Sequence, residues 1–369
     1  MGELFILMKK KSVVAILAMM LSVALVLSGC SESKSPKDQL AAAIEKSADI
    51  KSYSLNGSMK IEDLQLPDEV MQEEGAAQAL GLLTGAELSW TGAYQADPML
   101  VELNMKISIS GDLAMSFNLP MIMNEEKMWI KIPNIPMLGL PEELTSKFVE
   151  FNLKELAEQQ GTEWPGAADM ATTTKFANDL SGIFFKHIDE KTYLSEVKAK
   201  DVGISDDKDL KSIVQVHVMK DQVEPLVNTV LKNIAPEVID LLAGNEEYRK
   251  LLELQPEDLD EAKKQLAEVK DEDVKEALAE FNEAVNTLDV TANLGINDKG
   301  YSSYTDATVK VGITEEGQSG SGTLKVVSEM TNINGDVKFE FGEPKAEDVI
   351  SEEELNEQLG GMFGSMMME

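Results

Sequence analysis

Apolar and polar residues alternate with a period of two through much of the first third of the chain. In segment 52–61, Tyr53, Leu55 and Met59 alternate with polar residues. Because neighbouring side chains of a strand point to opposite faces, this pattern predicts strands with one apolar and one wet face, which is typical of antiparallel sheets. The same alternation predicts four further strands, at 88–96, 101–109, 113–119 and 128–132.

Apolar residues recur at helical spacing in the other segments. A first helix is expected to begin at Ser35-Pro36, because proline is favoured in the first turn. Its apolar face comprises Leu40, Ala43, Ile44 and Ala48. The longest helical block is 221–286, with a break expected near Pro236 and a restart at Pro256. Further helices are predicted at 145–159, 171–186 and 350–359.

A second group of strands is expected in the rest of the chain. The alternation predicts them at 191–200, 212–219, 287–297, 301–314, 321–332 and 336–341. Turns rich in Gly, Asn and Asp join the last four. About eleven antiparallel strands combined with amphipathic helices indicate an α+β fold.

The N-terminal segment has the pattern of a secretory signal peptide, which we place at residues 1–29. Lys9, Lys10 and Lys11 precede an apolar run from Val13 to Leu27, and small residues follow it. The run is too short to span a bilayer comfortably, and the small residues mark a cleavage point. The alternative is an uncleaved N-terminal helix that anchors the chain.

Cys30 directly follows Leu27-Ser28-Gly29 and is the single cysteine of the 369-residue chain. The sequence Leu-Ser-Gly-Cys resembles the bacterial lipobox, which implies a diacylglycerol thioether on Cys30. The lipidated residue and a short polar tether then occupy 30–35. We expect a lipid-anchored protein on the extracytoplasmic face of the cell membrane. The preference for Lys over Arg favours a Gram-positive source.

Charge narrows the range of partners. The formal net charge is −33, and Arg249 is the one arginine. A chain without a basic cluster beyond the signal peptide is a poor match for nucleic acid. Simple solubility outside the cell explains the acidity. The lipid anchor makes the membrane the expected partner, and a protein partner is not specified by the sequence.

The opening of the mature chain, SADIKSYSLNGSMK at 47–60, is similar to the start of Gram-positive lipoproteins of the LolA/LppX/LprG-type half-barrel superfamily. The order of lipobox, short helix, meander strands, inserted helices and closing strands resembles the same superfamily. The resemblance implies a single domain at 36–345, in which a large curved antiparallel sheet wraps around helices and a cavity holds acyl chains. Residues 346–369 would form an acidic helix and a flexible Met-rich tail.

The apolar faces of the early strands are rich in methionine, an unbranched side chain that adapts to variable apolar ligands. The alternative is that these faces form an ordinary core. The candidate ligand-binding residues are Met59, Met105, Ile107, Met115, Phe117, Met121, Met123 and Met128. Segments 66–86 and 132–141 are candidates for a lid or a membrane-facing tip, or for loops packed on the core.

Catalytic and metal-binding patterns are weak. His187 and His217 are the two histidines, and no nucleophile elbow, zinc motif or phosphate-binding loop accompanies them. The Asp206–Asp209 and 297–300 turns lack calcium-loop spacing. Thioethers that would suit Cu(I) occur in the tail, which a flexible terminus also explains: Met362, Met366, Met367 and Met368. We expect no cofactor, no metal and no enzymatic activity.

The sequence thus predicts an extracytoplasmic lipoprotein that binds an apolar or amphipathic ligand, such as a lipid, in a half-barrel cavity. The alternative is a non-catalytic surface module that binds a protein or a wall polymer. A hydrolase is the third and remotest interpretation, because paired carboxylates distant in the sequence can still meet in a cleft.

Overall fold

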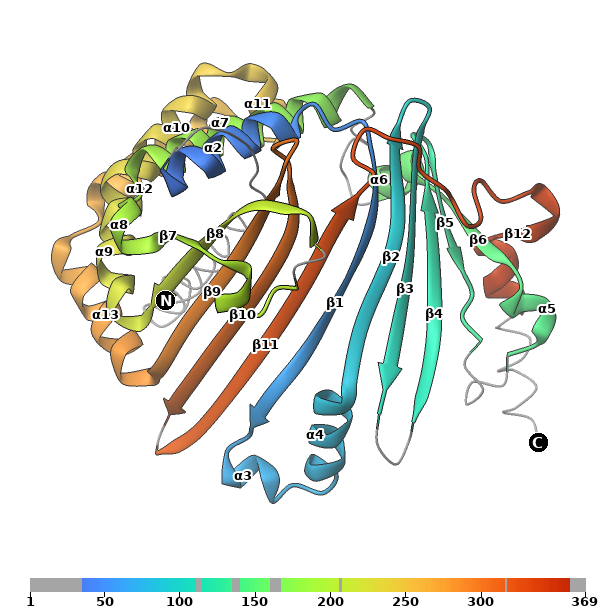
Figure 1. The fold of residues 1–369 in the computed structure, drawn as a ribbon, viewed down its shortest axis with the longest axis horizontal. Helices are drawn as coiled ribbons and strands as arrows, with labels where there is room; N and C mark the ends of the chain where they lie inside the picture. The colour runs from blue at the N-terminus through green and yellow to red at the C-terminus, as the bar shows by residue number, and fades with distance from the viewer. Residues whose placement is uncertain are drawn as a thin grey trace. The chain divides into compact units, whose positions relative to one another are not determined.

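The computed structural model describes residues 35–110, 114–134, 140–159, 167–205, 208–315 and 317–358. In this part of the chain the fold is α+β: twelve strands form one mixed sheet that is not closed, and several helices accompany it (Figure 1). The chain divides into two compact units, described separately below. Their described residues are 35–49, Ile61–Thr84 and Asp169–Val327 in unit 1, and Ile50–Lys60, Gly85–Ala168 and 328–358 in unit 2.

Unit 2 is built on the meander that the alternation predicts. Its strands are hydrogen-bonded in the order β12-β6-β5-β4-β3-β2-β1. They are β1 (Ser52–Gln65), β2 (Ala86–Ala96), β3 (Met99–Ile109), β4 (Met115–Met123), β5 (Lys127–Lys131), β6 (Phe148–Asn152) and β12 (Val349–Ser351). Neighbours from β1 to β6 pair antiparallel, but β12 pairs parallel with β6. The expectation of a purely antiparallel sheet is therefore wrong at this edge.

Unit 1 holds the later strands, in the order β11-β10-β9-β8-β7. They are β7 (Leu194–Val197), β8 (Leu210–Met219), β9 (Val285–Asn297), β10 (Ser302–Glu315) and β11 (Gln318–Thr331). Both β1 and β11 have residues in each unit. The strands predicted at 212–219, 287–297, 301–314 and 321–332 are confirmed.

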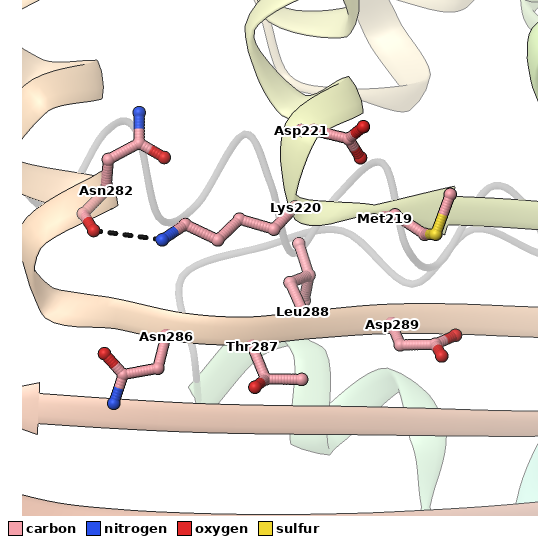
Figure 2. Close-up of a pocket in the computed structure, with 8 residues that line it drawn as sticks. All are labelled: Met219, Lys220, Asp221, Asn282, Asn286, Thr287, Leu288 and Asp289. Carbon is pink, nitrogen blue, oxygen red and sulfur yellow. Dashed lines mark hydrogen bonds between the residues drawn. The ribbon is translucent and has the colours of Figure 1, made fainter.

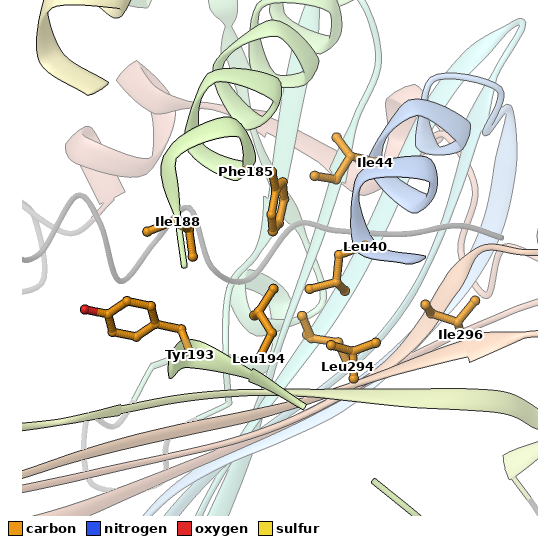
Figure 3. Packing of buried hydrophobic residues seen from close by; sticks show 9 residues of the cluster. Leu40, Ile44, Phe185, Ile188, Tyr193, Leu194, Leu294 and Ile296 are labelled. Atoms are coloured by element: carbon orange, nitrogen blue, oxygen red, sulfur yellow. The ribbon is translucent and has the colours of Figure 1, made fainter. Parts of the chain in front are cut away.

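The main core of unit 1 lies between helices and one face of its strands. Leu40 and Ile44 of α2 (Pro36–Ser47) pack with Phe185 of α7 (Ala167–His187), and Leu294 and Ile296 of β9 face them (Figure 3). The predicted start and apolar face of α2 are confirmed, except at its C-terminal end. There, Ala48 is exposed because the helix ends one residue earlier.

The long helical block is confirmed, but its predicted break near Pro236 is wrong. A π-helical segment, Val230–Ile234, joins α9 (Val223–Thr229) directly to α10 (Ala235–Gly244). The wider π turn accommodates a proline, which lacks an N–H and whose ring would collide with the preceding turn of an α-helix. The chain instead leaves the helix at Asn245. The remaining helices of the block are α11 (Glu246–Leu251), α12 (Pro256–Glu268) and α13 (Asp271–Ala284).

Three other predicted elements differ from the structure. Segment 145–159 contains β6 before a short helix, α6 (Leu153–Gln159). Segment 191–200 begins in α8 (Glu190–Tyr193), so that β7 has only four residues. Segment 350–359 begins with the last two residues of β12, and its helix covers 352–358. Strands of three or four residues, such as β7 and β12, are too short for a period to identify.

Within the described residues, no helix is both long and apolar enough to cross a membrane.

Candidate functional site

The strand register of unit 2 places all eight predicted methionine-face residues on one side of the sheet. Directly opposite residues of paired strands share a face. Across neighbouring strands, Met59 pairs with Leu88, Leu88 with Ile107, and Ile107 with Phe117. The remaining pairs are Met105 with Trp90 and Leu119, Met115 with Ile109, Met121 with Leu103, and Met123 with Val101 and Met128. We call this surface of β1–β5 the Met-rich face.

The Met-rich face is half-buried, whereas the opposite face is buried at one end and exposed at the other. Each of the eight predicted residues is half-buried. On the opposite face, Glu102, Ile122 and Trp129 are 5%, 0% and 5% exposed. An apolar surface is usually the buried one, because removing it from water is favourable. Unit 2 reverses this arrangement at one end of β2–β5, whereas at the other end of the opposite face Lys106, Ser116 and Asn118 are exposed.

A C-terminal strap, residues 332–347, covers the buried end of the opposite face. Its main anchor is Glu102, whose carboxylate accepts the backbone N–H groups of Glu340, Phe341 and Gly342 at 2.7, 2.9 and 3.0 Å. The strand predicted at 336–341 is therefore wrong: the backbone donors of its last residues bind a side chain and not a neighbouring strand. The ring of Phe341 also lies 5.8 Å from that of Phe148.

Charged groups next to the strap are paired. Glu150 accepts a hydrogen bond from Trp129 Nε1 at 2.8 Å, and its other oxygen lies 2.8 Å from Lys127 Nζ. Burial raises the pKa of Glu150, but the hydrogen bonds from Lys127 and Trp129 outweigh it and leave the pKa below its ordinary value. The carboxylate therefore stays ionised and keeps both partners. The end of this face beside the strap is therefore covered and its charges are paired.

Two tyrosines mark one end of the Met-rich face. Tyr53 and Tyr94 lie opposite each other on β1 and β2, and their ring centroids are 5.3 Å apart. Burial raises the pKa of both phenols, and in Tyr53 the neighbouring Tyr94 adds to the rise. Both hydroxyls therefore stay protonated near neutral pH and can donate hydrogen bonds. The Met-rich face therefore ends at two hydroxyl groups, those of Tyr53 and Tyr94.

The edge of the Met-rich face at β6 is closed by packing. Val149 of β6 is buried with Ile350 of β12 and with Leu144 of α5 (Glu142–Thr145). Leu355 of the helix 352–358 packs against the same cluster. The open part of the face therefore lies on β1–β5. Nine residues of a strand span about 30 Å, and five neighbouring strands about 19 Å.

A separate depression in unit 1 is lined mostly by polar residues, together with Met219 and Leu288. Its volume is about 430 Å³, and it lies between the end of β8 and the start of β9 (Figure 2). Lys220 Nζ donates to the carbonyl of Asn282 at 3.0 Å, and Asp221 and Asp289 add carboxylates. None of the predicted ligand-binding residues lines it. Its lining includes no aromatic ring on which a sugar or a base could stack.

The two histidines lie in different settings. His187 Nε2 lies 3.0 Å from Glu237 Oε1, which also lies 2.7 Å from Lys186 Nζ. Hydrogen bonds from Lys186 and His187 lower the pKa of Glu237. His217 pairs with Asp289 at 3.1 Å on the polar face of β8. Among the described residues, no group of three or more His, Cys, Asp or Glu side chains could hold a metal ion.

Several predicted features lie outside the described residues. They are the signal peptide, Cys30, Asp206, residues 135–139 of the proline-rich loop, and the tail methionines Met362, Met366, Met367 and Met368. The 66–86 excursion is described: it contains α3 (Asp68–Met71) and α4 (Ala76–Gly85), and neither helix has a buried residue.

Sequence reasoning missed Glu102 and the strap. Glu102 occupies a polar position in an alternating strand, so its sequence context resembles that of any exposed glutamate. Its partners lie more than 230 residues away. No local signal links them.

No protein-family model matches this chain, and no curated protein matches it.

Proposed function

We propose that this chain is a membrane-anchored extracytoplasmic lipoprotein that holds an apolar or amphipathic ligand, of the lipid class, against the Met-rich face. The lipobox at Cys30 supports the location. A single observation carries the binding proposal: in unit 2 the apolar face is half-buried along its length, whereas the strap covers the opposite face at one end.

The chemistry of the face suits such a ligand. Methionine side chains are flexible and polarizable, so they adapt to chains of different shape. A surface of about 30 by 19 Å is near the largest apolar patch found on soluble monomers, and such patches often serve binding. In our proposal the sheet curves over the ligand as a half-barrel, with acyl chains along β2–β4.

The tyrosine pair would orient an amphipathic ligand. Tyr53 and Tyr94 would donate hydrogen bonds to a polar headgroup, while the apolar chains extend toward Met59 and Met115 at the other end of the face. A ligand held in this way needs no reacting group. We therefore propose binding and transfer without catalysis.

Paired variants of one strand test this proposal. Met121→Glu places a charge on the Met-rich face, whereas Asn118→Glu places the same charge on the opposite face of β4, beside Lys106. Mass spectrometry of gently purified protein should find lipid bound to the wild type and to Asn118→Glu. Met121→Glu should lose it at least tenfold.

The same experiment discriminates the alternative. Half-buried apolar residues also suit docking of a partner protein, because protein interfaces use apolar patches of this size. If no lipid co-purifies with the wild type, and Met121→Glu instead abolishes capture of a protein partner from the cell surface, then the interaction-module interpretation is correct.

A further inference from the structure

The connection from β1 to β2 carries a second apolar surface. The sequence of α4, AAQALGLLTG, contains no charged residue, and none of its residues is buried. Leu83 is 48% exposed, and Val70 of α3 is 38% exposed. Surface helices are normally stabilised by burying one apolar face. In α4 that stabilisation is incomplete, because Leu80 and Leu82 are only half-buried, so another medium can add to it.

The polar groups of α4 need little water. Thr84 Oγ1 donates to the carbonyl of Leu80 within the same helix at 2.8 Å. Gln78 is then the one other polar side chain of α4. A helix satisfies its internal backbone groups by itself, and here its hydroxyl is satisfied as well. The helix is therefore suited to an environment with few hydrogen-bonding partners.

The length of α4 fits the surface of a bilayer. Ten residues of α-helix extend about 15 Å, which is half the hydrocarbon thickness of a membrane. A helix of this length cannot cross, but it can lie in the interface with its side chains among the acyl chains. Its C-terminal end is fixed, because Ser110 donates to the carbonyl of Gly85 from its backbone nitrogen at 2.9 Å and from its hydroxyl at 3.0 Å.

We propose that α4 inserts into the interfacial region of the lipid bilayer. A protein groove requires a single apolar stripe, whereas the exposed Ala77 lies about 120° from Leu83 and about 160° from Ala79 around α4, at 100° per residue. A fluid hydrocarbon phase can contact all of them. The inference rests on the membrane location in the proposed function, and it adds a second contact beyond the anchor at Cys30.

Charges beside α4 specify the type of lipid. Asp68, Glu69, Glu73 and Glu74 precede it and are exposed. Carboxylates are repelled by anionic headgroups within about 10 Å at 0.1 M salt. The bilayer that α4 enters most readily is therefore zwitterionic. Insertion should weaken as phosphatidylglycerol is added, and salt should reverse part of the loss.

A single-label experiment tests the insertion. Leu83→Cys provides a labelling site, because the one natural cysteine, Cys30, is consumed by lipidation in our proposal. The full chain is reconstituted in phosphatidylcholine vesicles and labelled with nitrobenzoxadiazole. The matched control is Gln265→Cys, an exposed site on α12. We expect doxyl-labelled phosphatidylcholine to quench the label at 83 at least threefold more than the label at 265.

Two outcomes would overturn the proposal. One is equal quenching at positions 83 and 265. The other is shielding of the label at 83 that depends on protein concentration and not on lipid, which would assign α4 to a contact with a second copy of the chain. The intact mass of the same sample reports whether Cys30 carries lipid, so a failure of the anchor is seen separately from a failure of α4. Binding of a ligand to the Met-rich face is tested separately, by the loss of lipid from Met121→Glu.

Discussion

Tyr248 of α11 shows how one side chain combines packing with a hydrogen bond in the helical part of unit 1. It is fully buried, and its ring centroid lies 5.1 Å from that of Phe176. Its hydroxyl donates to Asp179 Oδ2 at 2.6 Å. Burial raises its pKa from the ordinary value of 10.0 to about 12, and the hydrogen bond and charge of Asp179 add to the rise. The phenol is thus held neutral in the folded chain.

This shift predicts a loss of stability in base. Below pH 10 the phenol is neutral in both folded and unfolded chains, so its contribution is fully present. Between pH 10 and about 12 the unfolded chain ionises Tyr248 and the folded chain does not, so the free energy of unfolding falls. Tyr248→Phe should reduce that slope without removing it, because Tyr53, Tyr94 and Tyr193 also have raised pKa values.

Urea unfolding of wild type and Tyr248→Phe at pH 7 and pH 11 measures the effect. At pH 7 the variant should lose about 1–2 kcal/mol, because Asp179 loses a hydrogen-bond partner. At pH 11 the difference between the two proteins should shrink. An identical slope in both proteins would show that Tyr248 does not carry the shift.

At the scale of elements, the strap depends on one carboxylate. Glu102 supplies acceptors for three backbone N–H groups, and hydrogen bonds to ionised groups are stronger than neutral ones. Residue 342 is Gly with φ of +66°, a conformation that other residues rarely adopt. The strap therefore depends on the carboxylate of Glu102 and on a glycine at position 342.

Glu102→Gln should release the strap. A glutamine keeps the volume, but it has one acceptor oxygen and no charge, so we expect a loss of about 2–3 kcal/mol of stability. Hydrogen exchange should show loss of protection at residues 340–342. The matched control is Glu343→Gln at the exposed contact with Asn124, which should cost under about 0.5 kcal/mol. Unchanged protection at 340–342 would contradict this account of the strap.

The elements that could be predicted most readily are those in which the alternation continues over many residues. The 14-residue strands β1, β10 and β11 were identifiable because alternation continues over many residues. The three-residue β12 was missed, and so was the five-residue β6. β12 pairs with β6 across about 200 positions of the chain, and β6 pairs on its other side with β5. Local propensity alone cannot identify such strands.

At the scale of the whole molecule, the net charge of −33 is a source of self-repulsion. Charges of one sign repel more in the compact state than in the expanded chain, and salt screens that repulsion. The structure shows few compensating contacts of high burial; Lys325 with Asp306, at 3.4 Å in unit 1, is one of them. The folded chain should therefore be more stable in salt.

Raising sodium chloride from 10 mM to 500 mM should increase the thermal unfolding midpoint by several degrees. Magnesium chloride at matched ionic strength should give the same increase, because screening depends on ionic strength and not on a specific site. A much larger effect of magnesium would instead indicate a divalent-cation site and would contradict the prediction of no metal.

The sequence by itself determined the alternating strands and the apolar identity of the Met-rich face, and it predicts a lipobox at Cys30, because each is a local pattern of residue types. It also assigned all eight methionine-face residues to apolar strand faces. Only the tertiary structure placed all eight on one side of a single sheet and showed where the strap covers the opposite face. The physical reason is distance along the chain: the strap reaches Glu102 from more than 230 residues away, and a pattern within one strand carries no information about what packs against it.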